Sequence, residues 1–98
     1  MRNDWKFDQA KNVAAITTRQ ALREGLPILR VVHYGNDHSW SFTCGTTNAP
    51  SDALVVSMEC IVEHDPTLID IANLPPGWGA YREALGSEWE RYEMEQTE

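Results

Sequence analysis

The sequence predicts a small single α+β domain, built as an antiparallel sheet with two or three short helices packed on one face. Two segments rich in β-branched and aromatic residues flank a turn-forming stretch, which is typical of a β-hairpin. Capping residues stand before two short apolar runs, as they do at helix starts. The chain has 98 residues, which suits one domain with one modest core.

The chain divides into three expected parts. Residues 1–11 form an N-terminal segment docked on the body, because a loose terminus rarely carries two large aromatics such as Trp5 and Phe7. Residues 12–92 form the α+β domain. Residues 93–98 form an acidic tail that frays.

The clearest strands are residues 27–35, PILRVVHYG, and residues 39–45, SWSFTCG. The stretch over residues 35–38 is a strong turn signal, and a loop of two or of four residues gives the same pairing. Side chains alternate across a strand, so the more apolar face is expected to meet the core. That face carries three facing pairs: Leu29 with Cys44, Val31 with Phe42, and His33 with Trp40. The other face carries Ile28, Arg30, Val32, Tyr34, Ser39, Ser41 and Thr43.

This alternation decides how to interpret a cysteine that lies close to histidines in the sequence. Cys44 is at the end of its strand far from the turn, whereas His33 and His38 are near or in the turn. With a rise of ~3.3 Å per residue, Cys44 and His33 are too far apart for a hydrogen bond. We therefore interpret Cys44 as a buried core residue and not as a nucleophile.

The segment before the hairpin is expected to form a strand and then a helix. The strand covers residues 12–17, and the helix runs from Thr18, its cap, to Glu24. Gly25 stands where a left-handed residue commonly ends a helix. A helical interpretation through Leu22 competes with the strand, because the alanines of this segment favour helix.

A short buried strand over residues 54–56 is expected after the hairpin. Ser57 then caps a helix over residues 58–64, with Cys60 and Ile61 on its inner side.

A third helix is expected to begin at Asp65, its cap, with Pro66 in the first helical position. Pro75-Pro76 ends it, because the residue before a proline avoids the helical region. Its apolar positions are Leu68, Ile69, Ile71, Ala72 and Leu74.

Residues 78–92 are open to two interpretations. Tyr81, Leu85, Trp89 and Tyr92 have helical spacing, whereas Trp78, Ala80, Arg82 and Ala84 alternate as in a strand.

The charge distribution favours one class of partner. The net charge is -7, and residues 31–81 contain six acids and no Lys or Arg. An acidic chain repels phosphate backbones, so nucleic acid is not an expected partner. Acidic patches instead attract basic proteins. The alternative is that the charge serves solubility alone.

No segment predicts a membrane or secretory protein. The N-terminus is polar and lacks the apolar region of a signal peptide, and no run approaches the ~20 apolar residues of a membrane span. The two cysteines have no zinc-type or disulfide-framework spacing, so we expect reduced thiols and a cytoplasmic location.

The sequence predicts no metal, no cofactor and no catalytic residue. A zinc site needs three or four converging ligands, and no motif of that kind occurs. Glu63, His64 and Asp65 resemble an acid/base cluster, but helix-end roles explain them more simply. A small ligand-binding protein or enzyme that uses His33, His38 or His64 remains the alternative hypothesis.

Four residues are candidates for an interaction surface: Trp78, Tyr81, Arg82 and Trp89. Trp78 stands between two glycines after two prolines, and Trp, Tyr and Arg are enriched at interface hot spots. The alternative is a tryptophan that covers the core of a small domain.

The order of several short motifs resembles an uncharacterised bacterial domain family related to immunity proteins of polymorphic toxin systems. The motifs are W-x-F-x-x-G (Trp40, Phe42, Gly45), VVSM (55–58), IVEHDPTL (61–68), LPPGWGAYRE (74–83) and W-x-R (Trp89, Arg91). The resemblance implies a curved antiparallel sheet and an extended segment after LPPGW, which favours a strand over residues 78–84. It brings no catalytic residues. Together with the absence of Lys and Arg from residues 31–81, it favours a non-catalytic, immunity-like module that binds a basic protein partner. A homodimer through a sheet edge or an aromatic patch is a third hypothesis.

Overall fold

A computed structural model describes residues 5–44 and 50–94, which form one sheet with helices on one side. The six strands lie in the order β4-β1-β3-β2-β5-β6. The strands are β1 (Ala14–Thr18), β2 (Arg30–His33), β3 (Trp40–Thr43), β4 (Ala53–Ser57), β5 (Trp78–Tyr81) and β6 (Glu90–Glu93). The α-helices are α1 (Arg19–Leu22) and α2 (Met58–His64), and the 3-10 helices are η1 (Pro50–Asp52) and η2 (Pro66–Ile71).

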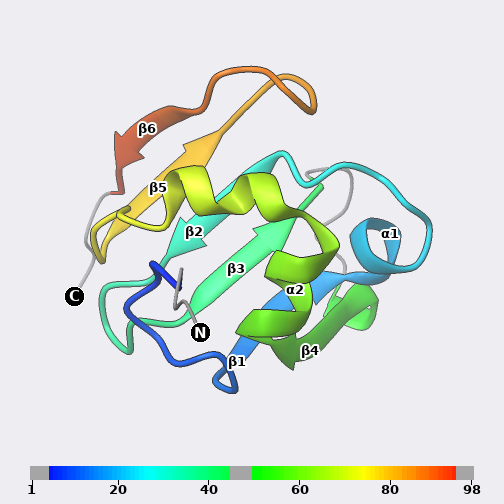
Figure 1. Cartoon of the computed structure of the whole chain (residues 1–98), viewed down its shortest axis with the longest axis horizontal. Helices are drawn as coiled ribbons and strands as arrows, with labels where there is room; N and C mark the ends of the chain where they lie inside the picture. The colour runs from blue at the N-terminus through cyan, green and yellow to red at the C-terminus, as the bar shows by residue number, and fades with distance from the viewer. Residues whose placement is uncertain (1–4, 45–49, 95–98) are drawn as a thin grey trace.

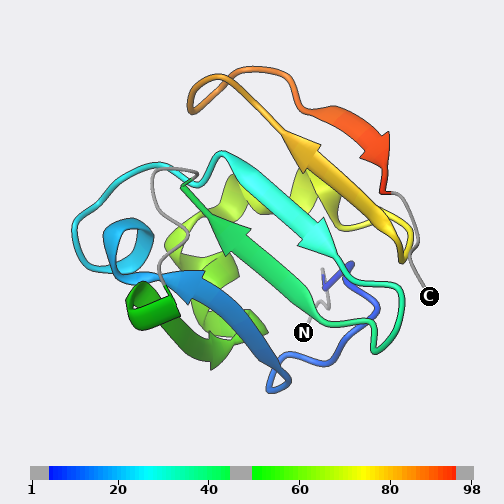
Figure 2. The same ribbon diagram turned by 180° about the vertical axis from the view of Figure 1, so that it is seen from behind.

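The α+β class is confirmed, but the sheet is mixed and not wholly antiparallel. β1 runs parallel to β3, whereas the other neighbouring strands are antiparallel. α2 and η2 lie in front of the sheet in Figure 1, and the opposite view in Figure 2 shows the strands with no described helix over them. A hairpin fixes antiparallel pairing locally, but β1 pairs with a strand that no short turn joins to it.

The register of the β2–β3 hairpin confirms most of the predicted pairing. Val31 pairs with Phe42, and His33 pairs with Trp40. The Tyr34 amide donates to the Ser39 carbonyl at 2.9 Å, so the loop between them has the four-residue form.

The predicted faces are wrong at the start of β2. The Leu29 amide donates to the Thr43 carbonyl at 3.0 Å, although Thr43 is the ladder partner of Arg30. Two residues therefore oppose one, which is the arrangement of a β-bulge. The extra residue shifts the alternation, so Ile28 is 1% exposed and belongs to the core. Leu29 is half-buried and lines a cavity with Arg30.

The first helix begins where the capping rule places it. The Thr18 hydroxyl oxygen accepts a hydrogen bond from the Ala21 amide at 3.3 Å, and Gly25 has a positive φ of 76°. β1 precedes this helix, so the strand interpretation is confirmed; the helix ends at Leu22, earlier than the predicted Glu24.

The second predicted helix has the expected bounds but a different inner side. Ser57 accepts from the Cys60 amide at 3.1 Å, as its capping role requires. Met58, Ile61 and Val62 are the buried residues of α2, whereas Cys60 is exposed and not on the inner side. Positions three and four apart share a helix face, and Cys60 falls outside the stripe that Ile61 belongs to.

The third predicted helix is a 3-10 helix. Asp65 accepts from the Thr67 amide at 3.1 Å and caps η2, and the Leu68 amide donates to the Asp65 carbonyl three residues back. Leu68, Ile71, Ala72 and Leu74 are buried, and Ile69 packs against the core.

The predicted strand over residues 54–56 is present as part of β4, but it is not a buried strand. Val55 is 71% exposed, because β4 is the last strand of the sheet and Val55 points away from the helices.

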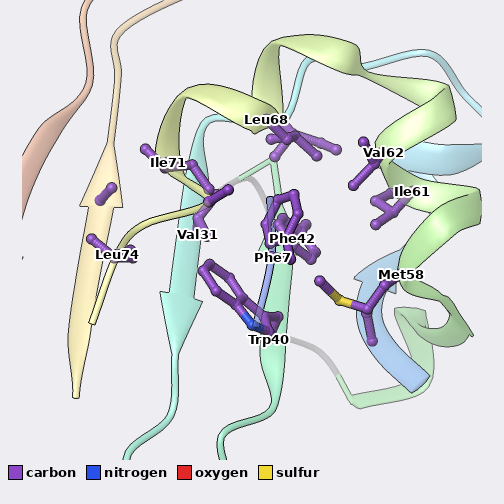
Figure 3. Packing of buried hydrophobic residues seen from close by; sticks show 14 of the residues in the cluster. Phe7, Val31, Trp40, Phe42, Met58, Ile61, Val62, Leu68, Ile71 and Leu74 are labelled. Carbon is purple, nitrogen blue, oxygen red and sulfur yellow. The ribbon is translucent and has the colours of Figure 1, made fainter. Parts of the chain in front are cut away.

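The core lies between the sheet and the layer formed by α2 and η2 (Figure 3). Trp40 and Phe42 from β3 are fully buried, and Phe7 of the N-terminal segment packs edge-on against Trp40 at a ring-centroid distance of 5.0 Å. Asp8 accepts from the Trp40 indole at 3.1 Å. Residues 5–11 therefore contribute to the core, whereas residues 1–4 lie outside the described part of the chain.

Residues 78–81 are extended and pair with both β2 and β6, so the strand interpretation of this segment is correct over these four residues. A Cβ at Gly79 would lie 2.5 Å from the Tyr92 ring, so only glycine fits beneath this tyrosine. Of the predicted tail, Glu93 ends β6, and residues 95–98 lie outside the described residues.

Candidate functional site

Figure 2 shows the side of the sheet turned away from α2 and η2, which we call the open face. Strand alternation directs residues of every strand to this side. Strand pairing aligns one residue of each strand in a row across it. The row runs Val55, Ile16, Ser41, Val32, Gly79 and Tyr92.

Large apolar side chains are exposed on the open face. Val55 and Tyr81 are 71% and 45% exposed, and Ile16 and Tyr34 are exposed as well. Alternation places these four side chains on one side of the sheet, because Tyr34 and Tyr81 are two residues from members of the row. A solvated sheet face usually carries polar residues, so an apolar group of this kind marks a candidate interaction surface.

A cavity of about 480 Å³ opens at the β5–β6 end of the open face. Its described lining is Leu29, Arg30, Cys44, Tyr81 and Tyr92. The bulge at the start of β2 turns Leu29 toward this cavity beside Arg30, and Gly79 leaves room for the Tyr92 ring. Tyr81 and Tyr92 contact each other at a ring-centroid distance of 6.2 Å, so two aromatic rings form one wall.

Acidic side chains surround this end of the sheet. Glu83, Glu88, Glu90 and Glu93 are all exposed. The Tyr81 hydroxyl donates to Glu90 at 3.1 Å, and this hydrogen bond with the carboxylate raises the pKa of Tyr81.

The arginine of β6 does not offset these acids on the open face. Arg91 donates to the Asn73 side chain at 2.8 Å and to the Asp70 carbonyl at 2.9 Å, so its charge is held toward the helical layer.

The four candidate residues of the sequence do not form one surface. Tyr81 is exposed on the open face. Trp78 pairs with His33 on the helix-covered face and is half-buried. Trp89 is also half-buried, and the Arg82 guanidinium lies over its ring at 4.2 Å.

Arg82 is a buried structural residue and is not part of an exposed interaction surface. It is 4% exposed and donates twice to the Ile28 carbonyl, at 2.9 and 3.0 Å. It also donates to Asp65 at 3.0 Å and to the Thr67 hydroxyl at 3.1 Å. Four hydrogen bonds and the face of the Trp89 ring therefore surround this buried guanidinium with partners.

The three histidines lie in different places. His33 is 1% exposed, stacks on Trp40 at 4.0 Å, and donates from Nδ1 to the Leu74 carbonyl at 2.7 Å. Its Nε2 lies 3.3 Å from Asp8. His38 is in the turn of the hairpin, with a ring-centroid distance of 6.1 Å to His33.

His64 lines a separate shallow groove together with Asp65. Its Nε2 is 2.9 Å from the Ala21 carbonyl. Asp65 accepts from Thr67 and Arg82, so both side chains already have structural partners. This agrees with the helix-end roles expected for them.

The alternation of side chains in the β2–β3 hairpin predicted part of the open face. The alternation that placed Trp40 and Phe42 in the core also placed Arg30, Val32 and Tyr34 on the opposite side. Tyr92, Val55 and Ile16 were missed as members of this surface, because their place depends on which strands pair.

Within residues 5–44 and 50–94, no group of three His, Cys, Asp or Glu side chains could hold a metal ion. None of the helices in the same ranges is both long enough and apolar enough to cross a membrane.

Comparison of the chain with family models, curated proteins and solved structures found no match in any of the three.

Proposed function

We propose that this protein is a non-catalytic interaction module that binds a basic protein partner at the β5–β6 end of the open face. The observation that carries the proposal is the exposed Tyr81 ring, which forms one wall of the cavity with Tyr92 on a sheet face that no described helix covers. Tyr81 and the cavity beside it supply contact area, since aromatic side chains that fill or border a pocket dominate interface energetics.

Charge supports a basic partner. Glu90 and Glu83 are exposed beside Tyr81 and both raise its pKa, and Arg30 is the one cation among the described lining residues of the cavity. Arg91 is engaged with Asn73 and Asp70. A negative rim accelerates encounter with a positive surface and selects against acidic partners. The aromatic wall then contributes the short-range contact that the charges do not provide.

The resemblance to an uncharacterised bacterial domain family related to immunity proteins of polymorphic toxin systems suits this kind of module. A cytoplasmic, immunity-like module would bind a basic toxin and cover its working surface. This role requires no catalytic residue, metal or cofactor in the module. It rests on the motifs quoted above and on the acidic, aromatic surface described here.

Affinity capture with charge-matched variants tests the proposal. The wild type, E83Q/E90Q beside Tyr81 and E59Q/E63Q on α2 are immobilised and exposed to a lysate of the native host at low ionic strength. We expect a basic protein to bind the wild type and E59Q/E63Q and to be lost from E83Q/E90Q. Rising salt should release it, because exposed charges are screened.

Recovery of no basic protein at low salt would count against the proposal. Equal retention by the two double variants would show that the charge of the β5–β6 end is not used. Tyr81→Ala separates the aromatic contribution, since it leaves the acids in place and should increase the dissociation rate of the captured protein.

A second candidate is the binding of a small ligand, and the cavity on the open face favours it. Its volume of about 480 Å³ lies within the range of ligand sites. None of the three histidines is among its described lining residues, so a histidine-based enzyme would have to use the groove with His64 and Asp65. Fragment screening by NMR distinguishes these two sites. Shift changes centred on Arg30 and Cys44 favour binding in the cavity, and shift changes at His64 favour binding in the groove.

A further inference from the structure

The two edges of the sheet differ in charge. β6 forms one edge and carries Glu90, Arg91 and Glu93 among its four residues. β4 forms the other edge with the sequence Ala-Leu-Val-Val-Ser, which contains neither a charge nor a proline. Natural proteins usually protect an edge strand with charges, prolines or bulges, because its unpaired backbone groups can pair with another chain.

The backbone of β4 presents hydrogen-bonding groups outward. The Met58 amide donates to the Val13 carbonyl, in the same register that pairs β4 with β1. Alternate residues of an antiparallel ladder turn their N–H and C=O groups to the same side. Leu54 and Val56 therefore bond to β1, whereas Val55 turns both backbone groups to the edge. Within the described ranges, β4 pairs with no strand except β1.

We propose that β4 pairs antiparallel with β4 of a second copy of this chain, about a twofold axis at Val55. In this register the two Val55 residues exchange both of their backbone hydrogen bonds, and Ala53 lies opposite Ser57 of the second copy. The side chains of Ala53 and Ser57 lie on the open face with that of Val55. Both are small, so they leave room for the second strand. The sheets of the two copies become continuous.

Side chains on the open face support this occupant. Ile16 lies beside Val55 in the cross-strand row. Pairing places the two Val55 residues next to each other with one Ile16 on either side, so four branched aliphatic side chains form one stripe across the joined sheets. Cross-strand aliphatic pairs of this kind stabilise strand pairing.

Charge makes this edge suitable for self-association in a chain whose net charge is -7. Like charges oppose contact between two copies over most of an acidic surface. β4 has none, and the acid that precedes it, Asp52, is paired with Arg19. Strand pairing alone buries less area than a standard interface, so we expect a weak dimer with a Kd on the order of 100 µM.

Sedimentation equilibrium tests the proposal with three forms of the chain. The wild type should show a mass that rises toward the dimer with concentration. Val55→Lys places like charges directly opposite each other at the twofold axis. This variant should therefore dimerise more weakly, with a Kd at least tenfold higher than that of the wild type. Tyr81→Lys adds the same charge near the other edge and should leave dimerisation unchanged. Thermal melting checks that both exposed-site variants remain folded.

Amide hydrogen exchange gives an independent readout. The Val55 amide should exchange quickly in dilute protein and become protected as the concentration rises. The Val56 amide bonds to β1 and should be protected at every concentration. A wild type that stays monomeric up to about 1 mM would overturn the proposal, as that is well above the expected Kd. A dimer that Tyr81→Lys dissociates and Val55→Lys does not would also overturn it.

The two proposals fail separately. Partner binding uses the β5–β6 end and self-association uses the opposite edge. Loss of dimerisation in Val55→Lys should therefore leave capture of a basic protein intact.

Discussion

The two faces of the same sheet differ in how much of their apolar surface is exposed. On the covered face, Val31, Trp40 and Phe42 have no exposed surface and pack under α2 and η2. On the open face, Val55 and Tyr81 remain largely exposed although they belong to the same sheet. Strand alternation alone separates them. The covered face therefore carries the packing of the core, and the open face carries the proposed binding site.

Truncation of a covered-face aromatic should give the largest stability loss. Phe42→Ala removes a fully buried ring and should lower the free energy of unfolding by about 3–5 kcal/mol. Tyr34→Ala on the open face is the matched control and should change it by less than about 1 kcal/mol. Urea unfolding measures both. Equal losses would show that the open face also carries the fold.

The buried ion pair behind β5 should be next. Arg82→Ala leaves Asp65 without its charged partner and frees the Ile28 carbonyl, so we expect a loss of about 3 kcal/mol. Arg91→Ala removes an exposed arginine with two hydrogen bonds and should cost about 1 kcal/mol or less. If the two arginine variants unfold at the same urea concentration, Arg82 does not have the structural role assigned here.

Gly79 lies in the open-face row and yet tolerates no side chain. Gly79→Ala places a Cβ 2.5 Å from the Tyr92 ring and should cost about 1–3 kcal/mol through overpacking. In a Tyr92→Ala background the same substitution should cost much less, and this double-mutant cycle isolates the contact. If Gly79→Ala costs as much stability in the Tyr92→Ala background as in the wild type, the Tyr92 ring is not the group that a side chain at position 79 meets.

The smallest effect concerns the Tyr81–Glu90 hydrogen bond. It raises the pKa of Tyr81 above the ordinary value of 10.0. Because the folded-state pKa is the higher one, the contact stabilises fully below pH 10 and is lost as the pH rises through the folded-state pKa. Glu90→Gln should lower the pKa of Tyr81 toward its ordinary value in a tyrosine titration, whereas Asp70→Asn should not. If the pKa of Tyr81 stays above its ordinary value in Glu90→Gln, the hydrogen bond with Glu90 is not the cause of the shift.

Local rules predicted much of the covered face and little of the strand order. Thr18, Ser57 and Asp65 all cap the helices expected of them, because capping depends on a few neighbouring residues. The parallel pairing of β1 with β3 depends on distant segments and has no local signal. The bulge at Leu29 likewise has no marker in the sequence, and it moved Ile28 to the core.

The candidate site was predicted only in part for the same reason. Tyr81 was identified as a contact residue and is exposed at the proposed surface. Arg82 was grouped with it, although strand alternation places Arg82 on the side of Trp78 and Ala80, toward the helices. The alternation could have predicted its burial, but its partners Asp65 and Thr67 come from a distant segment.

NMR mapping of a captured basic partner on the isotope-labelled chain tests the central claim most directly. We expect the amide shifts of Arg30, Tyr81, Glu90 and Tyr92 to change and those of the buried residues of α2 to stay unperturbed. Shift changes confined to α2 and η2, with Tyr81 and Tyr92 unaffected, would contradict the assignment of recognition to the open face.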